Sequence, residues 1–550
     1  MLKTLHWYIS RELIRITLMA LAVFTLLFTV IMIMEPMRKK GLATGQVAQL
    51  FVYTLPAMVT FTLPFAALFA VTFTYGRFAQ DRELLACRAS GIATAAILRP
   101  GLFLGIAITV ISLVLTNFVA PASARAGEAA TLSNFKAIAY HMIRKESHAK
   151  FGDYIVHATH VDPDKDALIG VVAGEMDTEV GPDGKTIRVM QAMVASQAFL
   201  QIDEVTDPND PDRTDYYASV DLRDPVGPLT NQPGLQVVHS QAQPSGWKID
   251  DPSQERPLFY DWDRLLEVYR NPGRHSEIRD RMGKVKRLIR YDRVLDDMET
   301  VLRAGRPQTV LRVDDRQFEI LAPRIRRRGP QMLRLTARRD GDGQLQPVRV
   351  RVYRGRDVQQ ATADSGVITC DYSPLSRESH INITLSGNVR VPAEPGVEAP
   401  RLETWQRGQI PLPPDPELLA TSPAEIYQDP EAYTDDETII ADVRGLRARA
   451  LKWKGEAYAE MHTRIAFGLQ GVLLVTLGAA LGVVLRSGQA ITALVVAMGP
   501  ALVGFISIKM GQRVLSNPES SDIVGLSVVW GSLVVLLAAN GFIYWRLRKV

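Results

Sequence analysis

Three polar residues that could carry out chemistry stand together at the start of an apolar segment: Glu460, His462 and Arg464. An enzyme that acts on lipids needs a polar catalytic cluster near the head groups, but this group includes no identifiable nucleophile or set of metal ligands. We favour a structural interpretation, in which the three side chains satisfy one another and nearby backbone carbonyls where the chain enters a membrane. The alternative is a polar gate or a contact for a lipid head group. Neither interpretation requires catalysis.

The other motifs that suggest an enzyme fail on their spacing. Gly184-Lys185-Thr186 could end a nucleotide-binding loop, but that loop needs a glycine five residues earlier, where this chain has Glu179. His157 and His160 are three residues apart, and on a strand this spacing places them on opposite faces. No HExxH, CxxC or nucleophile-elbow pattern is present. The sequence therefore predicts no catalytic residue, no metal site and no cofactor.

A short charged segment at residues 77–91 has the features of a docking helix. Asp81 can cap the helix, Glu83 lies in its first turn, where a carboxylate suits the helix dipole, and Gly91 can end it. The remaining candidate contact residues are Arg82, Leu84, Leu85 and Arg88. Such a helix could dock a partner on the inner side of a membrane. The simpler alternative is a polar loop with capping residues.

A cluster of three cations follows the first apolar segment: Arg38, Lys39 and Lys40. One interpretation is ordinary contact with anionic head groups. The other is a site for a phosphorylated, strongly anionic lipid in the outer leaflet, because clustered cations at head-group depth suit phosphate by charge and by hydrogen bonding. The residues alone leave both interpretations open.

Six long apolar segments, three near each end of the chain, position these residues. Each reaches or nearly reaches the ~20 residues that a helix needs to cross a ~30 Å hydrocarbon core. The segments are 16–34, 41–76, 100–124, 465–485, 487–508 and 523–544. Averages conceal them, because a net charge of +4 and 22% charged residues would fit a soluble protein. The sequence predicts a membrane α-helical bundle of six transmembrane helices, arranged three plus three around a large insertion.

Basic residues in the short loops set the expected orientation, because Arg and Lys favour the cytoplasmic side. They are Lys3, Arg11 and Arg15, then Arg77, Arg82, Arg88 and Arg99, and finally Arg546, Arg548 and Lys549. Both termini are therefore expected in the cytoplasm and the insertion in the periplasm, as in a multi-pass protein of a bacterial inner membrane. Cys87 and Cys370 then occupy different compartments and cannot form a disulfide.

The insertion has mainly the pattern of β-strands. Polar and apolar residues alternate in 186–189, 348–352 and 381–385, which is typical of strands with one buried face. We therefore expect a sandwich or β-jellyroll. A helical period replaces the alternation over 262–303 and predicts a helical insertion.

The basic residues of this helical stretch, together with a run just beyond it, form either a solvated face or a binding patch. The run is Arg324, Arg326, Arg327 and Arg328. The expected divisions are membrane helices at 1–124, a β-jellyroll-like domain at 125–435, a helical stalk at 436–464 and membrane helices at 465–550.

Three segments carry a resemblance to a known family. Asp81-Arg-Glu-Leu-Leu-Ala-Cys-Arg-Ala-Ser-Gly91, between the second and third apolar segments, is similar to the signature of the LptF/LptG permeases. Asn117-Phe-Val-Ala-Pro121 leaves the third segment as in that family, and Glu460-Met-His-Thr-Arg464 enters the fourth as its Glu-x-His-x-Arg pattern does. The expected layout also resembles that of the family.

The resemblance implies a transport function. Family members form the transmembrane part of an ABC transporter that extracts lipopolysaccharide from the inner membrane, working as a pair with a separate cytoplasmic ATPase dimer. For this chain it implies that residues 77–91 form the coupling helix, that Glu83 seats in the ATPase groove and that the Arg38 to Lys40 cluster contacts lipid phosphates. A periplasmic β-jellyroll bridge would receive the lipid by edge-to-edge strand addition. No nucleic acid is expected as a partner.

An alternative from another class is a membrane-anchored periplasmic scaffold or sensor. In that case the six spans only hold the β domain in place. This alternative predicts no ATPase partner and no effect of changing Glu83.

Overall fold

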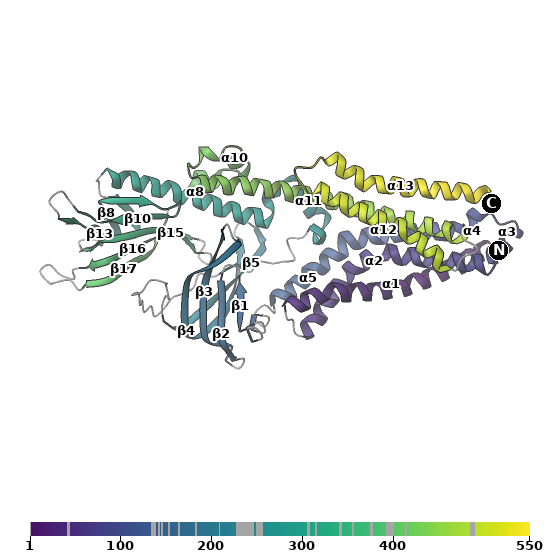
Figure 1. Cartoon of the computed structure of the whole chain (residues 1–550), viewed down its shortest axis with the longest axis horizontal. Coiled ribbons are helices and arrows are strands. Elements are labelled where there is room, and N and C mark those ends of the chain that lie inside the picture. Colours follow the sequence, from purple (N-terminus) through teal and green to yellow (C-terminus); the bar gives the residue numbers. More distant parts are fainter. Residues whose placement is uncertain are drawn as a thin grey trace. The chain divides into compact units, whose positions relative to one another are not determined.

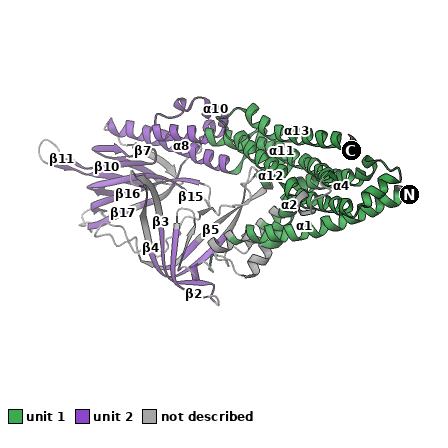
Figure 2. Ribbon diagram, turned by 45° about the vertical axis from the view of Figure 1, so that its right-hand side comes forward, with its two compact units in different colours: residues 1–141, 251–276, 448–550 green, residues 142–250, 277–447 purple. Residues whose placement is uncertain are grey.

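The computed structural model consists of long helices and antiparallel sheets (Figure 1). The residues that it describes are 2–40, 44–133, 139–140, 143–144, 147–151, 154–162, 165–181, 184–207, 210–226, 247–248, 257–304, 308–313, 316–339, 344–354, 357–373, 378–391, 401–412, 415–484 and 490–549. They fall into two compact units (Figure 2). Unit 1 comprises residues 1–141, 251–276 and 448–550, and unit 2 comprises residues 142–250 and 277–447.

Long helices, with short helical segments between them, make up most of unit 1. They are α1 (Leu2–Lys40), α2 (Thr44–Gln80), α3 (Glu83–Ala89), α4 (Thr94–Val114), the π-helical turn η1 (Leu115–Val119), α5 (Ala120–Ser133), α11 (Glu437–Val484, which begins in unit 2), α12 (Ala490–Leu515) and α13 (Asp522–Lys549). Six described stretches are long and apolar enough to cross a membrane: Lys3–Met32, Phe51–Gln80, Thr94–Gly127, Glu437–Val484, Val495–Leu515 and Asp522–Leu547. The expectation of six candidate membrane helices is confirmed.

The two most buried of these helices, α11 and α2, pack closely because of small residues. A Cβ atom built on Gly478 of α11 would lie 2.6 Å from Thr72 Oγ1 of α2, and one built on Gly482 would lie 3.0 Å from the backbone nitrogen of Gly76. Larger side chains at either position would force the helices apart. Buried apolar side chains around this contact join α1, α2, α3, α4 and α11 in one cluster.

The third apolar helix is longer than the sequence indicated. α4, η1 and α5 follow one another without a break, so Pro121 lies inside the helix and not after it. Because proline has no N–H, it cannot donate to the carbonyl four residues earlier, which is that of Asn117. The wider π-helical turn directly before it accommodates this missing donor. The expected end of the segment at Ala124 is therefore too early.

A short part of the insertion belongs to unit 1. It consists of η2 (Pro257–Phe259), α7 (Trp262–Arg270) and η3 (Pro272–Arg274). Asp261 caps α7, because its side chain accepts a hydrogen bond from the backbone N–H three residues later at 2.9 Å. Leu265 and Val268 of α7 are fully buried, in an apolar cluster with Ala457 and Met461 of α11. This segment is therefore packed on the fourth candidate span.

One of the sheets in unit 2 is a meander of six antiparallel strands. They are β1 (His148–Phe151), β2 (Tyr154–Asp162), β3 (Ala167–Gly181), β4 (Gly184–Asp207), β5 (Asp210–Val226) and β6 (Trp247–Lys248). Each strand pairs with its neighbour in the sequence. Gly181 and Gly184 pair at the tip of the β3–β4 hairpin, so Gly184-Lys185-Thr186 begins a strand and is not a nucleotide loop.

The second sheet has nine strands. They are β7 (Gln308–Val313), β8 (Arg316–Leu321), β9 (Arg324–Arg327), β10 (Met332–Thr336), β13 (Val348–Arg354), β14 (Asp357–Ala363), β15 (Ser365–Ser373), β16 (Glu378–Arg390) and β17 (Arg401–Pro411), beside a small ribbon of β11 (Arg338–Arg339) and β12 (Leu345–Gln346). The order is β7-β8-β13-β14-β16-β15-β10-β9, and β17 pairs with β16. Buried and accessible residues alternate along β10 and β16, as the sequence pattern predicted.

The expectation of an antiparallel β region with a helical insertion agrees with these elements, whereas a β-jellyroll remains a proposal. The helices expected over 262–303 are present as α7 and α8 (Ser276–Arg303). The two compact units do not coincide with the divisions expected from the sequence, because α7 groups with the long helices of unit 1 and α8 with the sheets of unit 2.

α8 holds the segment that leads out of the β region. That segment contains α9 (Pro416–Ala420), α10 (Pro423–Gln428) and η4 (Pro430–Ala432). Lys286 Nζ donates to the carbonyls of Leu419 and Thr421 at 3.2 and 2.7 Å, and Arg290 donates to the carbonyl of Leu412. Burial lowers the pKa of both basic side chains. The expectation of a solvated basic face is wrong for these residues, because they are partly buried and donate to backbone carbonyls of this segment.

Candidate functional site

α3 connects α2 to α4 and has one anchored face and one exposed face. Leu84 is 8% exposed and packs in the same apolar cluster as Phe78 of α2 and Leu98 of α4. Glu83 is exposed, and Leu85 is 54% exposed. The loop therefore presents a carboxylate and an apolar side chain on a short helix that the core holds in place.

The start of α3 differs from the sequence expectation. The residue before the helix is Arg82, which has a left-handed conformation with φ of 60°, and no side chain caps the helix. The backbone N–H of Asp81 donates to the carbonyl of Arg77 at 2.9 Å, in the turn that ends α2. The prediction of Asp81 as the cap is wrong, because α2 runs to Gln80 and leaves Asp81 in that turn.

The end of α3 agrees with the sequence expectation. Gly91 has φ of +81°, and its N–H donates to the carbonyl of Arg88 at 2.9 Å. The N–H of Ile92 donates to the carbonyl of Cys87 at 3.1 Å. These two hydrogen bonds form a Schellman motif, in which glycine adopts the left-handed conformation at little cost. Gly91 therefore fixes where α3 stops.

A pocket of about 310 Å³ lies beside α3. It is lined by Ala79, Gln80, Arg82, Leu84, Leu85, Arg88, Thr94, Ile97, Leu98 and Val483. The lining combines two cations with apolar side chains from α2, α3, α4 and α11. A hollow of this chemistry can receive a side chain of a docking partner.

Polar contacts hold the helices that flank α3. The hydroxyl of Tyr75 on α2 donates to the carbonyl of Ile97 at 3.0 Å and accepts from the N–H of Gly101 at 3.3 Å, both on α4. Arg77 of α2 forms an ion pair of 3.0 Å with Glu12 of α1. α1, α2 and α4 are therefore tied together close to the loop that carries α3.

The second predicted site contains a buried ion pair on α11. Arg464 Nε donates to Glu460 Oε1 at 3.0 Å, and the two side chains are only 2% and 4% exposed. Arg464 Nη2 donates to the carbonyls of Pro257 and Leu258, each at 3.0 Å. Arg464 Nη1 donates to Asn117 Oδ1 at 3.2 Å. All three nitrogens of the guanidinium therefore have acceptors.

The carboxylate of Glu460 is shared with the fifth candidate span. Gln512 Nε2 of α12 donates to Glu460 Oε2 at 2.7 Å, and Lys509 Nζ donates to Gln512 Oε1 at 2.8 Å. We use the name Arg464 cluster for Arg464, Glu460, Asn117 and Gln512. The cluster joins α11, α12, the π-helical turn and η2. A buried ion pair is tolerated only when such additional hydrogen bonds satisfy it.

His462 does not belong to this cluster, although the sequence grouped the three residues. Its Nδ1 accepts a hydrogen bond from Trp530 Nε1 of α13 at 3.3 Å, and its ring packs edge-on against Tyr458 with 4.5 Å between the ring centroids. Residues two apart on a helix point ~200° away from each other. The structural interpretation therefore fits Glu460 and Arg464, whereas His462 packs against a different helix.

Two further points of the sequence analysis concern the cation cluster at the end of α1 and metal binding. Arg38, Lys39 and Lys40 end α1, but their side chains lie outside the described residues, so their lipid contact stays a prediction. Within the described part of the chain, no group of three or more His, Cys, Asp or Glu side chains could hold a metal ion.

Sequence reasoning missed the partners of Arg464. Asn117 was singled out for its motif but not as a ligand of the guanidinium, and Gln512 was not singled out. A signal for Gln512 was present, because an amide and Lys509 directly follow an apolar segment. The carbonyls of Pro257 and Leu258 carry no side-chain signal that a sequence pattern could reveal.

The comparison with protein families identifies the N-terminal part of the chain. Residues 7–198 match the family described as lipopolysaccharide export system permease LptF/LptG. No curated protein matches the chain. The matched range includes α3 and Asn117, which are two of the three segments that carried the resemblance. Over this range, the chain is similar to the LptF/LptG permease family.

Proposed function

We propose that this chain is the transmembrane permease subunit of an ABC transporter that extracts lipopolysaccharide, or a similar large anionic lipid, from the inner membrane. The similarity of residues 7–198 to the LptF/LptG family and the six candidate membrane helices support the permease role. LptF/LptG permeases are transporter components and not enzymes, so ATP hydrolysis belongs to a separate cytoplasmic ATPase dimer. A second permease of the LptF/LptG type completes the membrane part.

The observation that carries this proposal is the pair of faces on α3. Leu84 anchors the helix in the bundle core, while Glu83 and Leu85 remain free for a partner. A helix fixed in this way can transmit a conformational change of a bound ATPase to α2 and α4. Asp81, Arg82, Arg88 and Gly91 complete the coupling segment. The nearby pocket offers room for a side chain of the ATPase groove.

The proposed topology places both termini and α3 in the cytoplasm and the β region in the periplasm, with three spans before it and three after. The cations in the short loops support this orientation. The Arg38 to Lys40 cluster would then meet lipid phosphates at the outer leaflet. The β region would pass the lipid to a periplasmic β-jellyroll bridge by strand addition at an open sheet edge.

Affinity co-purification tests the proposal. The full chain is extracted from its native membrane in mild detergent as the wild type, Glu83→Arg and Leu85→Asp, and the eluates are analysed by proteomics and ATPase assay. We expect the wild type to bring down an ABC ATPase and a second six-span homologue, and both variants to lose the ATPase alone. Glu519→Arg is the matched control, because Glu519 is also exposed but lies in the loop between α12 and α13.

The same experiment separates the transporter from a scaffold. If no ATPase accompanies the wild type under several mild extractions, or if Glu83→Arg and Leu85→Asp retain it, the coupling role of α3 is wrong. Orientation is tested with an impermeant maleimide on cysteine-free chains that carry Ser90→Cys or Glu519→Cys. The two sites should react from opposite sides of the membrane, and labelling from the same side would contradict the topology.

A further inference from the structure

Three exposed arginines lie on one face at an edge of the nine-stranded sheet. Arg324 and Arg326 are on β9, which ends the sheet, and Arg334 is on the adjacent strand β10. Arg326 and Arg334 are directly opposite each other in the antiparallel register. We use the name arginine face for these three residues.

Within the part of the chain that the structure describes, the side chains of the arginine face have no acidic partners. Among the described residues, no carboxylate forms an ion pair with Arg324, Arg326 or Arg334, and all three are exposed. Like charges directly opposite each other on paired strands destabilise a sheet. A repulsive pair without a counter-charge indicates that the anion comes from another molecule.

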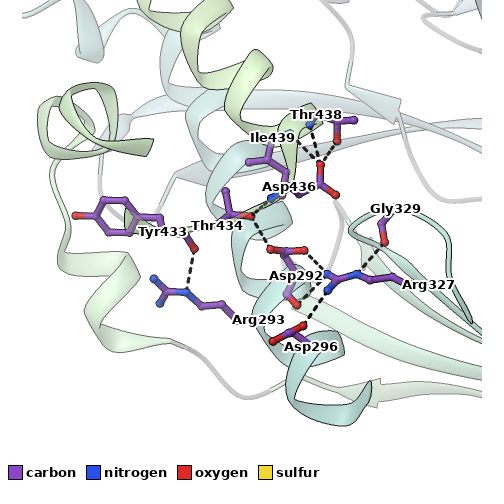
Figure 3. Close-up of polar contacts among 10 residues, drawn as sticks. All are labelled: Asp292, Arg293, Asp296, Arg327, Gly329, Tyr433, Thr434, Asp436, Thr438 and Ile439. Atoms are coloured by element: carbon purple, nitrogen blue, oxygen red, sulfur yellow. Dashed lines mark hydrogen bonds and ion pairs between the residues drawn. The ribbon is translucent and has the colours of Figure 1, made fainter. Parts of the chain in front are cut away.

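The residue that follows Arg326 has a different environment. Arg327 alternates with Arg326 along β9 and points to the opposite face, where it forms an ion pair with Asp292 of α8 (Figure 3). Asp292 also accepts a hydrogen bond from Thr434 Oγ1 at 2.5 Å, and Arg327 Nη1 lies 3.5 Å from Asp296 Oδ1. Arg327 is therefore the arginine of β9 that links the sheet to α8, and the residues of the arginine face do not take part in this contact.

Protection of the sheet edge does not explain the arginine face. Charged residues on an edge strand prevent unwanted strand pairing, and this would account for Arg324 and Arg326. Arg334 lies one strand inward, between β9 and β15, where no edge needs protection. β9 is also only four residues long, which makes it a poor template for strand addition by a partner protein. The arrangement favours a ligand that lies on the face.

The spacing of the guanidinium groups suits phosphate. Opposite residues on paired antiparallel strands have Cβ atoms ~5 Å apart, so Arg326 and Arg334 can both donate to one phosphate. Arg324 is two residues along the strand from Arg326, or ~7 Å away, and can reach a second phosphate on the same molecule. Arginine forks bind phosphate in bidentate fashion and with geometric selectivity.

We propose that the arginine face binds the phosphorylated sugar head group of the anionic lipid that the chain transports. This inference rests on the proposed function, because it takes the ligand from the transported lipid. It adds a second contact for the head group, on the β region and distant in sequence from the Arg38 to Lys40 cluster. The arginine face would hold the phosphates while the acyl chains are carried elsewhere.

Binding to the purified full chain in detergent tests the proposal. The probes are bisphosphorylated lipid A, the same lipid after enzymatic removal of its phosphates, and inositol hexakisphosphate as a soluble polyphosphate. The variants are Arg326→Gln/Arg334→Gln and the charge-preserving Arg326→Lys/Arg334→Lys. Arg349→Gln is the matched control, because Arg349 is an exposed arginine on β13 of the same sheet whose neighbours across the strands are Leu321 and Thr362.

We expect the double Gln variant to weaken binding of bisphosphorylated lipid A at least tenfold, the double Lys variant to weaken it about threefold and Arg349→Gln less than twofold. The dephosphorylated lipid should bind equally to all variants. Because the opposed cations repel, the double Gln variant should keep or raise the thermal midpoint of the chain.

Three results would overturn the proposal. The first is unchanged affinity of the double Gln variant for lipid A. The second is a lower thermal midpoint in that variant, which would mean that the arginines are structural. The third is an effect confined to inositol hexakisphosphate, which would assign the site to a soluble anion. None of these assays requires an ATPase partner, so failure here is distinguishable from failure of the transporter proposal.

Discussion

Replacing Arg464 by methionine should destabilise the membrane bundle strongly. The substitution keeps an unbranched apolar stem but removes the donors to Glu460, Asn117 and the carbonyls of Pro257 and Leu258. It leaves a carboxylate that is 4% exposed and that, among the described residues, keeps only the amide of Gln512 as a partner. Removing one partner of a buried ion pair costs about 3–5 kcal/mol. We expect a loss of this size in the free energy of unfolding.

The assay is titration of the full chain with sodium dodecyl sulfate in mixed micelles, followed by tryptophan fluorescence. Arg513→Met is the matched control, because Arg513 is an exposed arginine on α12, and its loss should cost less than about 0.5 kcal/mol. A double variant, Glu460→Met/Arg464→Met, removes both charges. It should be more stable than Arg464→Met alone, because no unpaired buried charge remains.

Two results would refute this reasoning. If Arg464→Met costs no more than Arg513→Met, the ion pair is not buried in the membrane-embedded protein. If the double variant is no more stable than Arg464→Met alone, the unpaired charge of Glu460 is not what destabilises the single variant.

Three further predictions follow from local geometry. Gly478→Val should destabilise the bundle by about 1–3 kcal/mol in the same titration, because its Cβ would lie 2.6 Å from a hydroxyl of α2. The control Gly531→Ala should be neutral or stabilising, because a Cβ there would have no atom within 4 Å. Gly91→Ala should cost about 1 kcal/mol, because φ is +81° there, and should weaken ATPase co-purification; equal stability would argue against the left-handed turn. Burial raises the pKa of Cys370 to about 12, so the folded chain should be alkylated at Cys87 long before Cys370. The slow alkylation rate at Cys370 should rise about tenfold per pH unit between pH 8 and 10. Comparable alkylation rates of the two cysteines at pH 8 would contradict the burial of Cys370.

The sequence alone was sufficient for the features that depend on local composition. Membrane helices need only an apolar run of the right length, so six candidate spans could be predicted without tertiary information. Gly91 was identified as the end of α3 because few other residues adopt its backbone conformation. The strand alternation of β16 was equally local. The similarity to the LptF/LptG family was recognisable because the motif between the second and third spans is contiguous.

Predictions failed where a neighbouring element decides the outcome. Asp81 has the residue type of a helix cap, but the extension of α2 to Gln80 placed it in a turn. The third apolar segment was expected to end at Ala124, but the π-helical turn before Pro121 allows α5 to continue to Ser133. In each case the local preference was real and a longer helix overrode it.

Tertiary structure alone decided which polar residues act together. Glu460, His462 and Arg464 lie within five residues of the chain, yet the helix directs Arg464 towards Asn117, 347 residues away, and His462 towards Trp530. Spacing along one helix fixes the direction of a side chain but not its partner, because the partner comes from another segment. The same holds for β9, where alternation separates Arg326 from Arg327, and only the packing of α8 reveals which of them the fold has neutralised.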